Sequence, residues 1–488
     1  MAQASMNDAP APTVSVEWDE VQRILLRGYR RHPYAHFSLL RVTRRADPAR
    51  WLGRMLEQGV VEFGWDSSGA LPAGSVAMSA EGLEAFGLSP DTIAGFSPEF
   101  VEGMTTSARS RILADMGSSA PERWLWGYDD NRVHVVLSLY ATSESALTEA
   151  VARHRAELDA SGLLEVVGAD GSPLGACAVL EKRREHFGFA DGISQPRFAA
   201  EPAGVVHRPP RDADRVAAGE LLLGYSNEAG IFPRSPTLSA TDRLKGPFAR
   251  PDGDFGRNGS YLVYRQLAQD VRAFWQATRM AKSEATVDDR IEFASKMVGR
   301  RPDGTPLVDR GRAAPTDPEA FDFAHDDPHG QACPLSAHIR RANPRATLST
   351  DPVEGLSKSK KHRILRRGRS YGAPLADPLS PEALIRAADS ELSVPGVRGL
   401  HFLGFNADIA NQFEFIQQTW VNGAVFQGLH GEVDALLGDP SVTGGLFTVP
   451  ADPLRCRFYG LPRFVDVRGG AYFFAPSRAA LRFLSTLA

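Results

Sequence analysis

The chain has 488 residues, and its 55 basic and 59 acidic side chains leave a formal net charge of -4. Apolar residues make up 43% and charged residues 23% of the sequence, which is ordinary globular usage and excludes collagen-like, coiled-coil and disordered chains. The balanced charge gives no electrostatic reason to expect nucleic acid or an anionic membrane as a partner. We therefore expect a folded, soluble protein that is long enough for two or three domains.

Targeting segments and cysteine pairs are missing from the sequence. The first residues lack a basic stretch followed by an apolar run, and no segment approaches 18 consecutive apolar residues. We therefore expect a cytoplasmic protein without a membrane span. Cys177, Cys333 and Cys456 lie far apart and form no CxxC pair, so neither a disulfide framework nor a thiolate zinc site is predicted.

The first half of the chain alternates between predicted strands and helices. Residues 1–16 are rich in Ala, Pro and Ser, and we interpret them as a disordered lead-in. A helix capped by Ser143 places Leu147, Val151 and Leu158 on one face. The predicted strands are residues 37–42, a hairpin of 123–126 and 133–139, and residues 163–167. This order is typical of an α+β sandwich with one antiparallel sheet and one helical layer.

The second half repeats a similar order of elements. Strands are predicted at residues 220–225, 259–264, 399–405 and 471–474, the last after a turn at Gly469 and Gly470, and helices at 265–281 and 408–421. The repeat predicts two related α+β units, an N-terminal domain at 17–208 and a C-terminal domain at 209–488. Segments 300–331 and 343–379 are rich in Pro, Gly and charge, and long loops of this type are often functional.

Common active-site signatures are absent, but three segments hold residues suited to chemistry. The sequence contains no GxGxxG, GxxxxGK[ST], HExxH or GxSxG pattern. The first segment, HFGFADGISQP at 186–196, sets Asp191 between glycines that let the backbone approach a flat ligand. An exposed Asx turn is the ordinary alternative for this segment.

The other two segments combine a histidine with arginines. His338 lies in CPLSAHIRRANPR at 333–345, where a neutral imidazole suits an iron and nearby arginines suit the carboxylates of a cofactor. A structural histidine also fits this segment. In RILRRGRSYG at 363–372, an arginine could stabilise an anion that develops beside a base. The basic run at 358–363 fits either a solvated loop or an anion-binding patch.

Taken in this order, the three segments resemble the dye-decolorizing (DyP-type) heme peroxidases. The resemblance continues through residues 258–267, 399–420 and 468–477, and it covers most of residues 18–480. It implies an α+β fold of two ferredoxin-like domains, with antiparallel sheets and helices and with heme b held in the C-terminal domain. It also implies a peroxidase that reduces hydrogen peroxide and oxidises dyes, phenols or other small organic donors through a ferryl intermediate.

The resemblance assigns roles to individual residues. His338 stands at the place of the proximal iron ligand, Asp191 at that of the distal acid–base residue, and Arg366 at that of the distal arginine. The residues that it places around the heme are Gly192, Ile193, Ser194, Asn343, Pro344, Arg345, Arg366, Leu403 and Phe405. It further implies an acidic residue that accepts the second ring N–H of His338, for which we favour Asp434 over Asp408 and Glu432.

Several alternatives stay open at the level of sequence. Bulky dyes would not fit a pocket narrowed by Leu403 and Phe405, so Trp420 and Tyr371 are candidate surface relays for electrons. The chain could instead be an enzyme that releases iron from heme, or a heme-binding or storage protein without turnover. A metal site without a cofactor could use His325, His329 and His338, although the segment around the first two is a poor helix.

Overall fold

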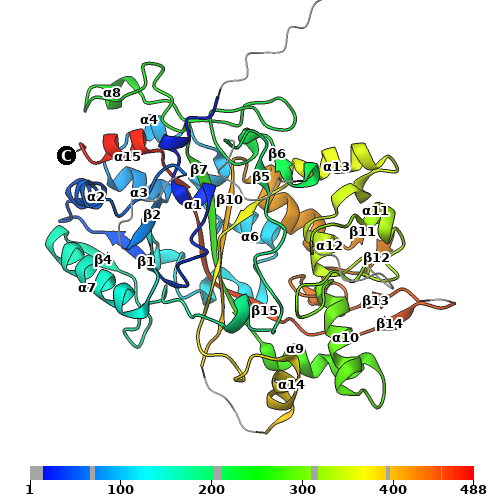
Figure 1. The fold of residues 1–488 in the computed structure, drawn as a ribbon. Coiled ribbons are helices and arrows are strands. Elements are labelled where there is room, and N and C mark those ends of the chain that lie inside the picture. Colours follow the sequence, from blue (N-terminus) through cyan, green and yellow to red (C-terminus); the bar gives the residue numbers. More distant parts are fainter. Residues whose placement is uncertain are drawn as a thin grey trace, which may run out of the picture.

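The computed structural model describes residues 15–65, 72–202, 211–308, 317–391, 396–451 and 453–487. A long antiparallel sheet forms its centre (Figure 1). Within these ranges the sheet has nine strands in the order β4-β1-β3-β2-β15-β7-β10-β8, with β9 also paired to β10. Most of the predicted lead-in and the predicted boundary between residues 208 and 209 lie outside the described residues.

The first half of the sheet comes from the N-terminal part of the chain. Its strands are β1 (Tyr34–Val42), β2 (Ala73–Met78), β3 (Val135–Ala141) and β4 (Leu163–Glu165), and β1 lies between β4 and β3. The helices of this half, with α15 from the end of the chain, are α1 (Arg23–Leu26), α2 (Pro48–Glu57), α3 (Ala80–Ala85), α4 (Pro90–Ile93), α5 (Pro98–Glu102), α6 (Ser107–Leu113), α7 (Glu144–Ser161) and α15 (Arg478–Leu484). The predicted cap of α7 is confirmed, because the Ser143 side chain accepts the Ala146 N–H.

The second half of the sheet repeats this arrangement. Its strands are β7 (Ser260–Gln269), β8 (Leu365–Arg366), β9 (Arg369–Tyr371), β10 (Gly399–Asn406) and β15 (Val465–Ala475). When β8 and β9, which both pair with β10, are counted as one strand, both halves have the strand order 4-1-3-2 by chain order, which is the ferredoxin-like arrangement. The two halves join where Phe474 of β15 pairs with Met78 of β2, so the predicted sheets are edge-to-edge parts of one sheet.

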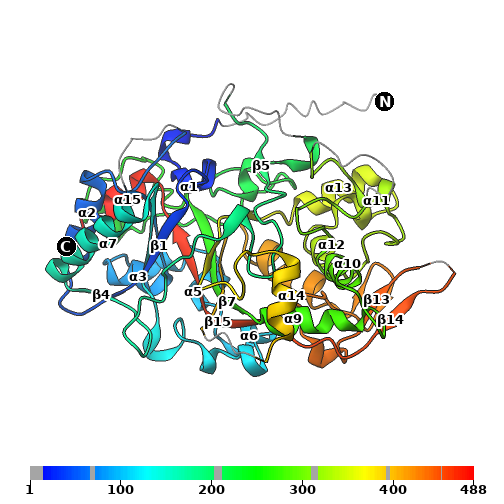
Figure 2. The ribbon, with the colours of Figure 1, turned by 60° about the horizontal axis from the view of Figure 1, so that its bottom comes forward.

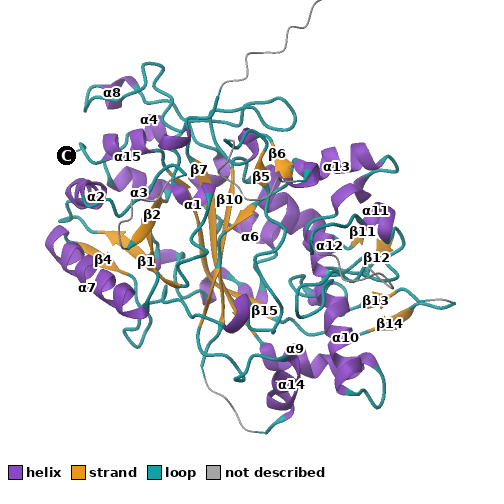
Figure 3. Ribbon diagram, viewed as in Figure 1, coloured by secondary structure: helices purple, strands orange, loops and turns teal. Residues whose placement is uncertain are grey.

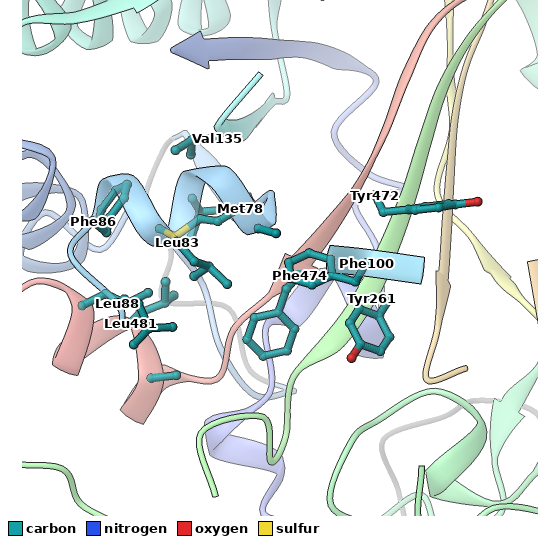
Figure 4. Packing of buried hydrophobic residues seen from close by; sticks show 14 of the residues in the cluster. Met78, Leu83, Phe86, Leu88, Phe100, Val135, Tyr261, Tyr472, Phe474 and Leu481 are labelled. Atoms are coloured by element: carbon teal, nitrogen blue, oxygen red, sulfur yellow. The ribbon is translucent and has the colours of Figure 1, made fainter. Parts of the chain in front are cut away.

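Aromatic and aliphatic side chains fill the junction between the two halves. Figure 4 shows Met78 and Val135 from the first half beside Tyr261 and Phe474 from the second. The rings of Phe100 and Tyr261 have centroids 5.5 Å apart. Burial of such large side chains dominates the stability of a core, so the junction ties the halves into one body.

Most of the additional helices and short strand pairs of the C-terminal half lie on the side away from α2 and α7 (Figures 1 and 2), whereas α8 (Ala240–Arg243) lies near α4 and α15. Figure 3 shows that long loops connect them. The helices are α8 (Ala240–Arg243), α9 (Val271–Ala277), α10 (Val287–Val298), α11 (Phe323–Asp326), α12 (His338–Ala342), α13 (Pro352–Lys360) and α14 (Pro381–Asp389). The short strand pairs are β5 (Arg197–Phe198) with β6 (Arg215–Val216), β11 (Val425–Phe426) with β12 (Leu429–His430), and β13 (Phe447–Val449) with β14 (Cys456–Phe458).

Several sequence predictions are wrong in detail. Residues 123–126 form no hairpin with β3, because β3 pairs with β1 and β2 on its two edges. The apolar run 220–225 forms buried turns instead of a strand. Residues 265–269 continue β7 and the helix starts only at Val271, because this stretch pairs with both β10 and β15.

Two glycines and one helix also differ from expectation. Gly469 and Gly470 lie inside β15, where the register shifts between Val467 and Gly469, so they form a bulge instead of a turn. The predicted helix at 408–421 is present, but Ala410–Glu414 and Ile416–Val421 are π-helical. π-Helical turns are rare and often lie at functional sites.

Candidate functional site

His338 and Asp434 form the best-defined pair in the C-terminal half. His338 is the first residue of α12, and its Nδ1 lies 2.9 Å from Oδ2 of Asp434. The N–H groups of Leu436 and Leu437 donate to Oδ1 of Asp434, each at 2.8 Å. Burial acts to raise the pKa of Asp434, but the charge and hydrogen bond of His338 and the two backbone N–H groups outweigh it, so the pKa lies below its usual value. Asp434 is therefore an ionised, saturated acceptor.

This contact fixes which ring nitrogen of His338 is free. In a neutral imidazole whose Nδ1 proton is donated to Asp434, the lone pair lies on Nε2. Among the described residues, Nε2 has no hydrogen-bond partner. The imidazole is 21% exposed, whereas the Asp434 side chain is fully buried. Nε2 thus faces open space and can serve as a metal ligand, with an orienting carboxylate behind it.

The arginines next to His338 hold the surrounding chain. Arg341 is buried and donates from Nη1 to the carbonyl of Trp420 at 2.6 Å and from Nη2 to that of Glu432 at 2.8 Å. Arg340 donates to the carbonyl of Asp327 at 2.8 Å. Their Nη groups are used by backbone carbonyls inside the protein, so these groups do not face a cofactor as the sequence had allowed. They fix α12 against the π-helical segment and the loop that leads to Asp434.

The Asp191 turn lies in a loop before β5. The Asp191 N–H donates to the carbonyl of Arg183 at 2.9 Å, and its Oδ1 accepts the Gly192 N–H at 2.6 Å. Asp191 is exposed, and Ser194 has a φ of 64°. Glu185 supports the turn from within, because its carboxylate accepts the N–H groups of Phe187 and Phe189 at 2.9 and 3.0 Å. Burial raises the pKa of Glu185 to about 7.

Arg366 meets this turn from the sheet. Its Nη2 donates to the carbonyl of Ile193 at 2.6 Å, and its backbone N–H donates to Oε1 of Gln195 at 2.9 Å. The predicted distal residues Asp191 and Arg366 therefore lie on segments that the structure brings together. Their catalytic roles stay predictions.

Arg345 links the turn to the His338 segment. Its Nη2 lies 3.2 Å from Oγ of Ser194, and its guanidinium lies 3.9 Å from the centre of the Phe321 ring. Burial, together with repulsion by Arg363, Arg211 and Arg300, lowers the pKa of Arg345 to about 10. Such mutual repulsion indicates a surplus of positive charge. The contact between Arg345 and Ser194 joins the segment with His338 to the turn with Asp191, so the two segments enclose one region.

Asn343 and Pro344 lie between His338 and Arg345 in the chain, and they support the loop that joins these two residues. Oδ1 of Asn343 accepts from Oγ of Ser359 at 3.3 Å, and Pro344 is buried.

Glu319 was missed by the sequence analysis. Its carboxylate accepts the Ser194 N–H, and its backbone carbonyl accepts from Arg345 at 3.2 Å. Glu319 lies in the long segment 300–331 but in none of the three motifs, so the sequence marked the loop and not the residue.

Leu403 and Phe405 do not reach this region. Residues opposite each other in antiparallel strands share a face, and Arg366 is opposite Gly404. Side chains alternate along a strand, so Leu400, Phe402 and Gly404 lie on the Arg366 face and Leu403 and Phe405 on the other. The latter two are buried with Leu262 and Phe473. The prediction that Leu403 and Phe405 crowd the site is therefore wrong, because both side chains point to the other face of the sheet. Leu400 and Phe402 lie on the face of Arg366 instead.

The remaining candidates lie elsewhere. Trp420 and Tyr371 are 4% and 7% exposed, so neither is a surface relay. Tyr371 packs against His401 on the face opposite Arg366, and Trp420 packs against Phe415. Within the described part of the chain no group of His, Cys, Asp and Glu side chains is arranged to hold a metal ion, so the proposed three-histidine site is not formed.

Comparison with known proteins identifies the family. Residues 238–453 match the family described as Dyp-type peroxidase, C-terminal. The multifunctional dye peroxidase DyP2 of Amycolatopsis sp. is 31% identical over 427 residues, covering 84% of this chain and 81% of that protein. The dye-decolorizing peroxidase msp1 of Mycetinis scorodonius is 29% identical over 435 residues, covering 84% and 76%. The chain therefore belongs to the DyP-type peroxidase family.

Solved structures confirm the fold class. The crystal structure of the Anabaena sp. DyP-type peroxidase has a TM-score of 0.73 and 23% identity, covering 96% of this chain and 94% of that chain. A dye-decolorizing peroxidase in complex with 2,6-dimethoxyphenol has a TM-score of 0.75 and 21% identity, covering 97% and 100%. Within the described ranges, no helix combines the length and apolar character needed to cross a membrane.

Proposed function

We propose that this protein is a heme peroxidase that reduces hydrogen peroxide and oxidises small organic donors. The observation that carries the proposal is the pair of His338 and Asp434, 2.9 Å apart, which leaves Nε2 of His338 free beside an ionised, buried carboxylate. A carboxylate behind a ligating histidine raises the basicity of the ligand. The similarity to proteins named as dye peroxidases supports the same function.

The residues present fit a heme. Nε2 of His338 would hold the iron, and the cationic cluster around Arg345 would hold the carboxylates of the macrocycle. Nη2 of Arg363 is buried there without a hydrogen-bond partner among the described residues, so an anionic oxygen in this region would satisfy it. Gly192, Ile193 and Ser194 would lie along one edge. When bound, heme b would supply an iron centre that takes up the oxidising equivalents of peroxide.

The distal residues of the chain would manage protons and charge. The Asp191 carboxylate is exposed on its turn and can take the proton from one peroxide oxygen and return it to the other. Arg366 would stabilise the negative charge that develops on the departing oxygen. Its hydrogen bond to the Ile193 carbonyl holds the guanidinium two residues from Asp191 along the turn. Phe402, on the same sheet face as Arg366, would help to exclude bulk water.

A direct experiment measures heme content and donor oxidation together. The purified protein, loaded with heme, is expected to contain one heme per chain and to oxidise 2,6-dimethoxyphenol only when hydrogen peroxide is added. That phenol is chosen because a dye-decolorizing peroxidase of similar fold was solved in complex with it. Heme binding without peroxide-dependent oxidation would favour a storage protein, and release of iron from the bound heme would favour a heme-degrading enzyme.

A further inference from the structure

Asp191 lies at the open end of a short hairpin whose closed end is held in the core. The Asp191 N–H donates to the carbonyl of Arg183 across this hairpin at 2.9 Å. At the closed end Phe187 and Phe189 are buried, and the rings of Phe187 and Phe274 have centroids 4.5 Å apart. The position of Asp191 therefore depends on whether the closed end stays folded.

The side chain of Glu185 holds the closed end together. Its Oε2 accepts the Phe187 N–H at 2.9 Å, and its Oε1 accepts the Phe189 N–H at 3.0 Å. Its backbone N–H donates to the carbonyl of Phe189 at 3.0 Å, and its carbonyl accepts the Gly188 N–H at 2.9 Å. Loss of the side chain would leave two N–H groups of buried residues without a partner, which is costly.

Gln269, the last residue of β7, ties Glu185 to the sheet. Its Nε2 donates to Oε2 of Glu185 at 2.7 Å, whereas its Oε1 is buried without a hydrogen-bond partner among the described residues. Buried polar atoms are almost always satisfied. A half-turn of the amide group would let Oε1 of Gln269 accept the proton of a neutral Glu185 carboxyl group. The pair therefore accommodates Glu185 in both protonation states.

The groups around Glu185 do not neutralise its charge. Within the described part of the chain, no lysine, arginine or histidine forms an ion pair with the Glu185 carboxylate. The titratable side chains next to Glu185 and Gln269 are bonded to backbone groups instead; they are Arg184, His186, Asp270 and Arg398. Burial, with repulsion by Asp191, outweighs the hydrogen bonds to Glu185 and raises its pKa to about 7.

The closed hairpin binds the Glu185 proton more tightly than an open hairpin would. In an open, hydrated hairpin the carboxyl group would return toward the ordinary glutamate pKa of about 4.3. Closing is therefore favoured while Glu185 is neutral, and it is weakened by up to about tenfold for each pH unit above about 7. An open hairpin would leave Asp191 without a fixed position relative to Arg366, which holds the same turn at Ile193.

We propose that Glu185 is a positioning residue for Asp191: as a neutral acid paired with Gln269 it keeps the hairpin closed, and its ionisation releases Asp191. The kinetic part of this role rests on the proposed function. Glu185 transfers no proton of peroxide and acts only through the hairpin. The peroxide step should therefore slow on the alkaline side, although Asp191 itself is still ionised there and able to act as a base.

The first test follows the reaction of the heme-loaded protein with hydrogen peroxide by stopped flow between pH 6 and 8.5. The wild-type rate constant should fall roughly threefold to tenfold over this range, within the limit that one linked proton sets. Glu185→Gln should keep its pH 6 rate throughout, because the amide is neutral at every pH, its oxygen can accept a backbone N–H and its nitrogen can donate to Gln269. Glu185→Ala lacks these contacts and should be slower at every pH.

Glu165→Gln is the matched control. Glu165 is a half-buried acid of the N-terminal half whose Oε1 lies 2.9 Å from Nε2 of His36, so this variant should keep the wild-type pH profile. An alkaline fall in Glu185→Gln equal to that of the wild type would overturn the proposal. So would a wild-type rate and profile in Glu185→Ala.

The second test follows amide hydrogen exchange without peroxide, so that it does not depend on turnover. Peptides that cover residues 183–191 are analysed by mass spectrometry, and the exchange rates are divided by the intrinsic rates at each pH. Protection should fall above pH 7 in the wild type and stay constant in Glu185→Gln. Wild-type protection that does not change with pH would overturn the proposal. Protection that falls as expected in a protein that does not react with peroxide would support the role of Glu185 and contradict the proposed function.

Discussion

The two sides of the candidate heme site are built differently. On the His338 side, both oxygens of the buried Asp434 are used within the protein, by the imidazole and by two backbone N–H groups. On the Asp191 side, the carboxylate is exposed and the nearby Arg366 donates to a backbone carbonyl. The ligand side is therefore fixed by the fold alone, whereas the side that would handle peroxide keeps hydrogen-bonding capacity for its substrate.

The largest effect is expected from His338→Ala. Removal of the imidazole takes away the one nitrogen that the fold orients toward the site, so we expect loss of heme during gel filtration. His325→Ala is the control, since the His325 side chain is 85% exposed and is expected to leave heme content unchanged. Equal heme content in the two variants would show that His338 does not hold the heme.

Asp191→Asn is expected to have the next largest effect. The amide preserves the shape of the side chain and cannot act as a base, and acid–base assistance typically contributes 10²–10⁴-fold to a rate. Stopped-flow mixing with peroxide should show a first step slowed by about that factor. Asp170→Asn, an exposed aspartate whose carboxylate accepts the Ser172 N–H in another turn, should keep the wild-type rate. A wild-type rate in Asp191→Asn would show that Asp191 is not the base.

Arg366→Leu is expected to slow the same step about 10²–10³-fold, the usual contribution of one electrostatic donor. Arg369→Leu is a matched control, because Arg369 lies on the opposite sheet face and donates to the Tyr29 carbonyl. If Arg366→Leu abolishes the reaction while Asp191→Asn remains close to wild type, Arg366 and not Asp191 dominates the peroxide step.

Asp434→Asn is expected to lower heme affinity or the rate of the peroxide step about 10- to 100-fold, the usual cost of removing the partner of a ligating histidine. Asp408→Asn tests the alternative from the sequence. Asp408 accepts the Asn411 N–H at 3.0 Å and the Asn411 side-chain amide at 2.7 Å, so that variant should behave as wild type. The reverse ranking of the two variants would reject Asp434 as the supporting acid.

The smallest effect concerns Glu185, which supports the Asp191 turn. Burial raises its pKa to about 7, so the native state binds a proton more tightly than the unfolded chain does. Its contribution to the free energy of unfolding is therefore present at pH 4 and is lost as pH rises through about 7. Glu185→Gln should flatten this part of the stability profile, measured by urea unfolding between pH 4 and 8. A flat profile already in the wild type would contradict the expectation, and Glu144→Gln serves as an exposed control.

The sequence predicts the parts of the fold that local signals specify. The Ser143 cap of α7 and the strands β7 and β10 have clear signals, and the repeat of element order reflects the two 4-1-3-2 halves of the sheet. The face of β10 could not be read, because Leu400, Phe402, Leu403 and Phe405 are all apolar and alternation is invisible in such a run. Long-range pairing with β10 and β15, which no local pattern shows, extends β7 over residues 265–269.

The residues of the site also fall into two groups, those that lie in a recognisable segment and those that only long-range contacts place at the site. His338, Asp191 and Arg366 lie in segments that a resemblance can mark, and the acidic partner that the resemblance implies for His338 is matched by the contact with Asp434. Glu319 and Arg300 lie in the long segment 300–331 and Asp115 lies far from Arg265 in the sequence, and only the folded chain sets Glu319 beside Ser194 and Asp115 beside Arg265. Their positions depend on how the loops and the two halves of the sheet pack, which no local pattern encodes.

The central claim is tested most directly by the absorption spectrum of the heme-loaded protein before and after one equivalent of hydrogen peroxide. The account predicts the Soret band of a histidine-ligated heme that changes on mixing with peroxide and returns when phenol is added. It predicts neither the starting band nor the return in His338→Ala. A Soret band that is the same in wild type and His338→Ala, or a wild-type band that does not respond to peroxide, would contradict it.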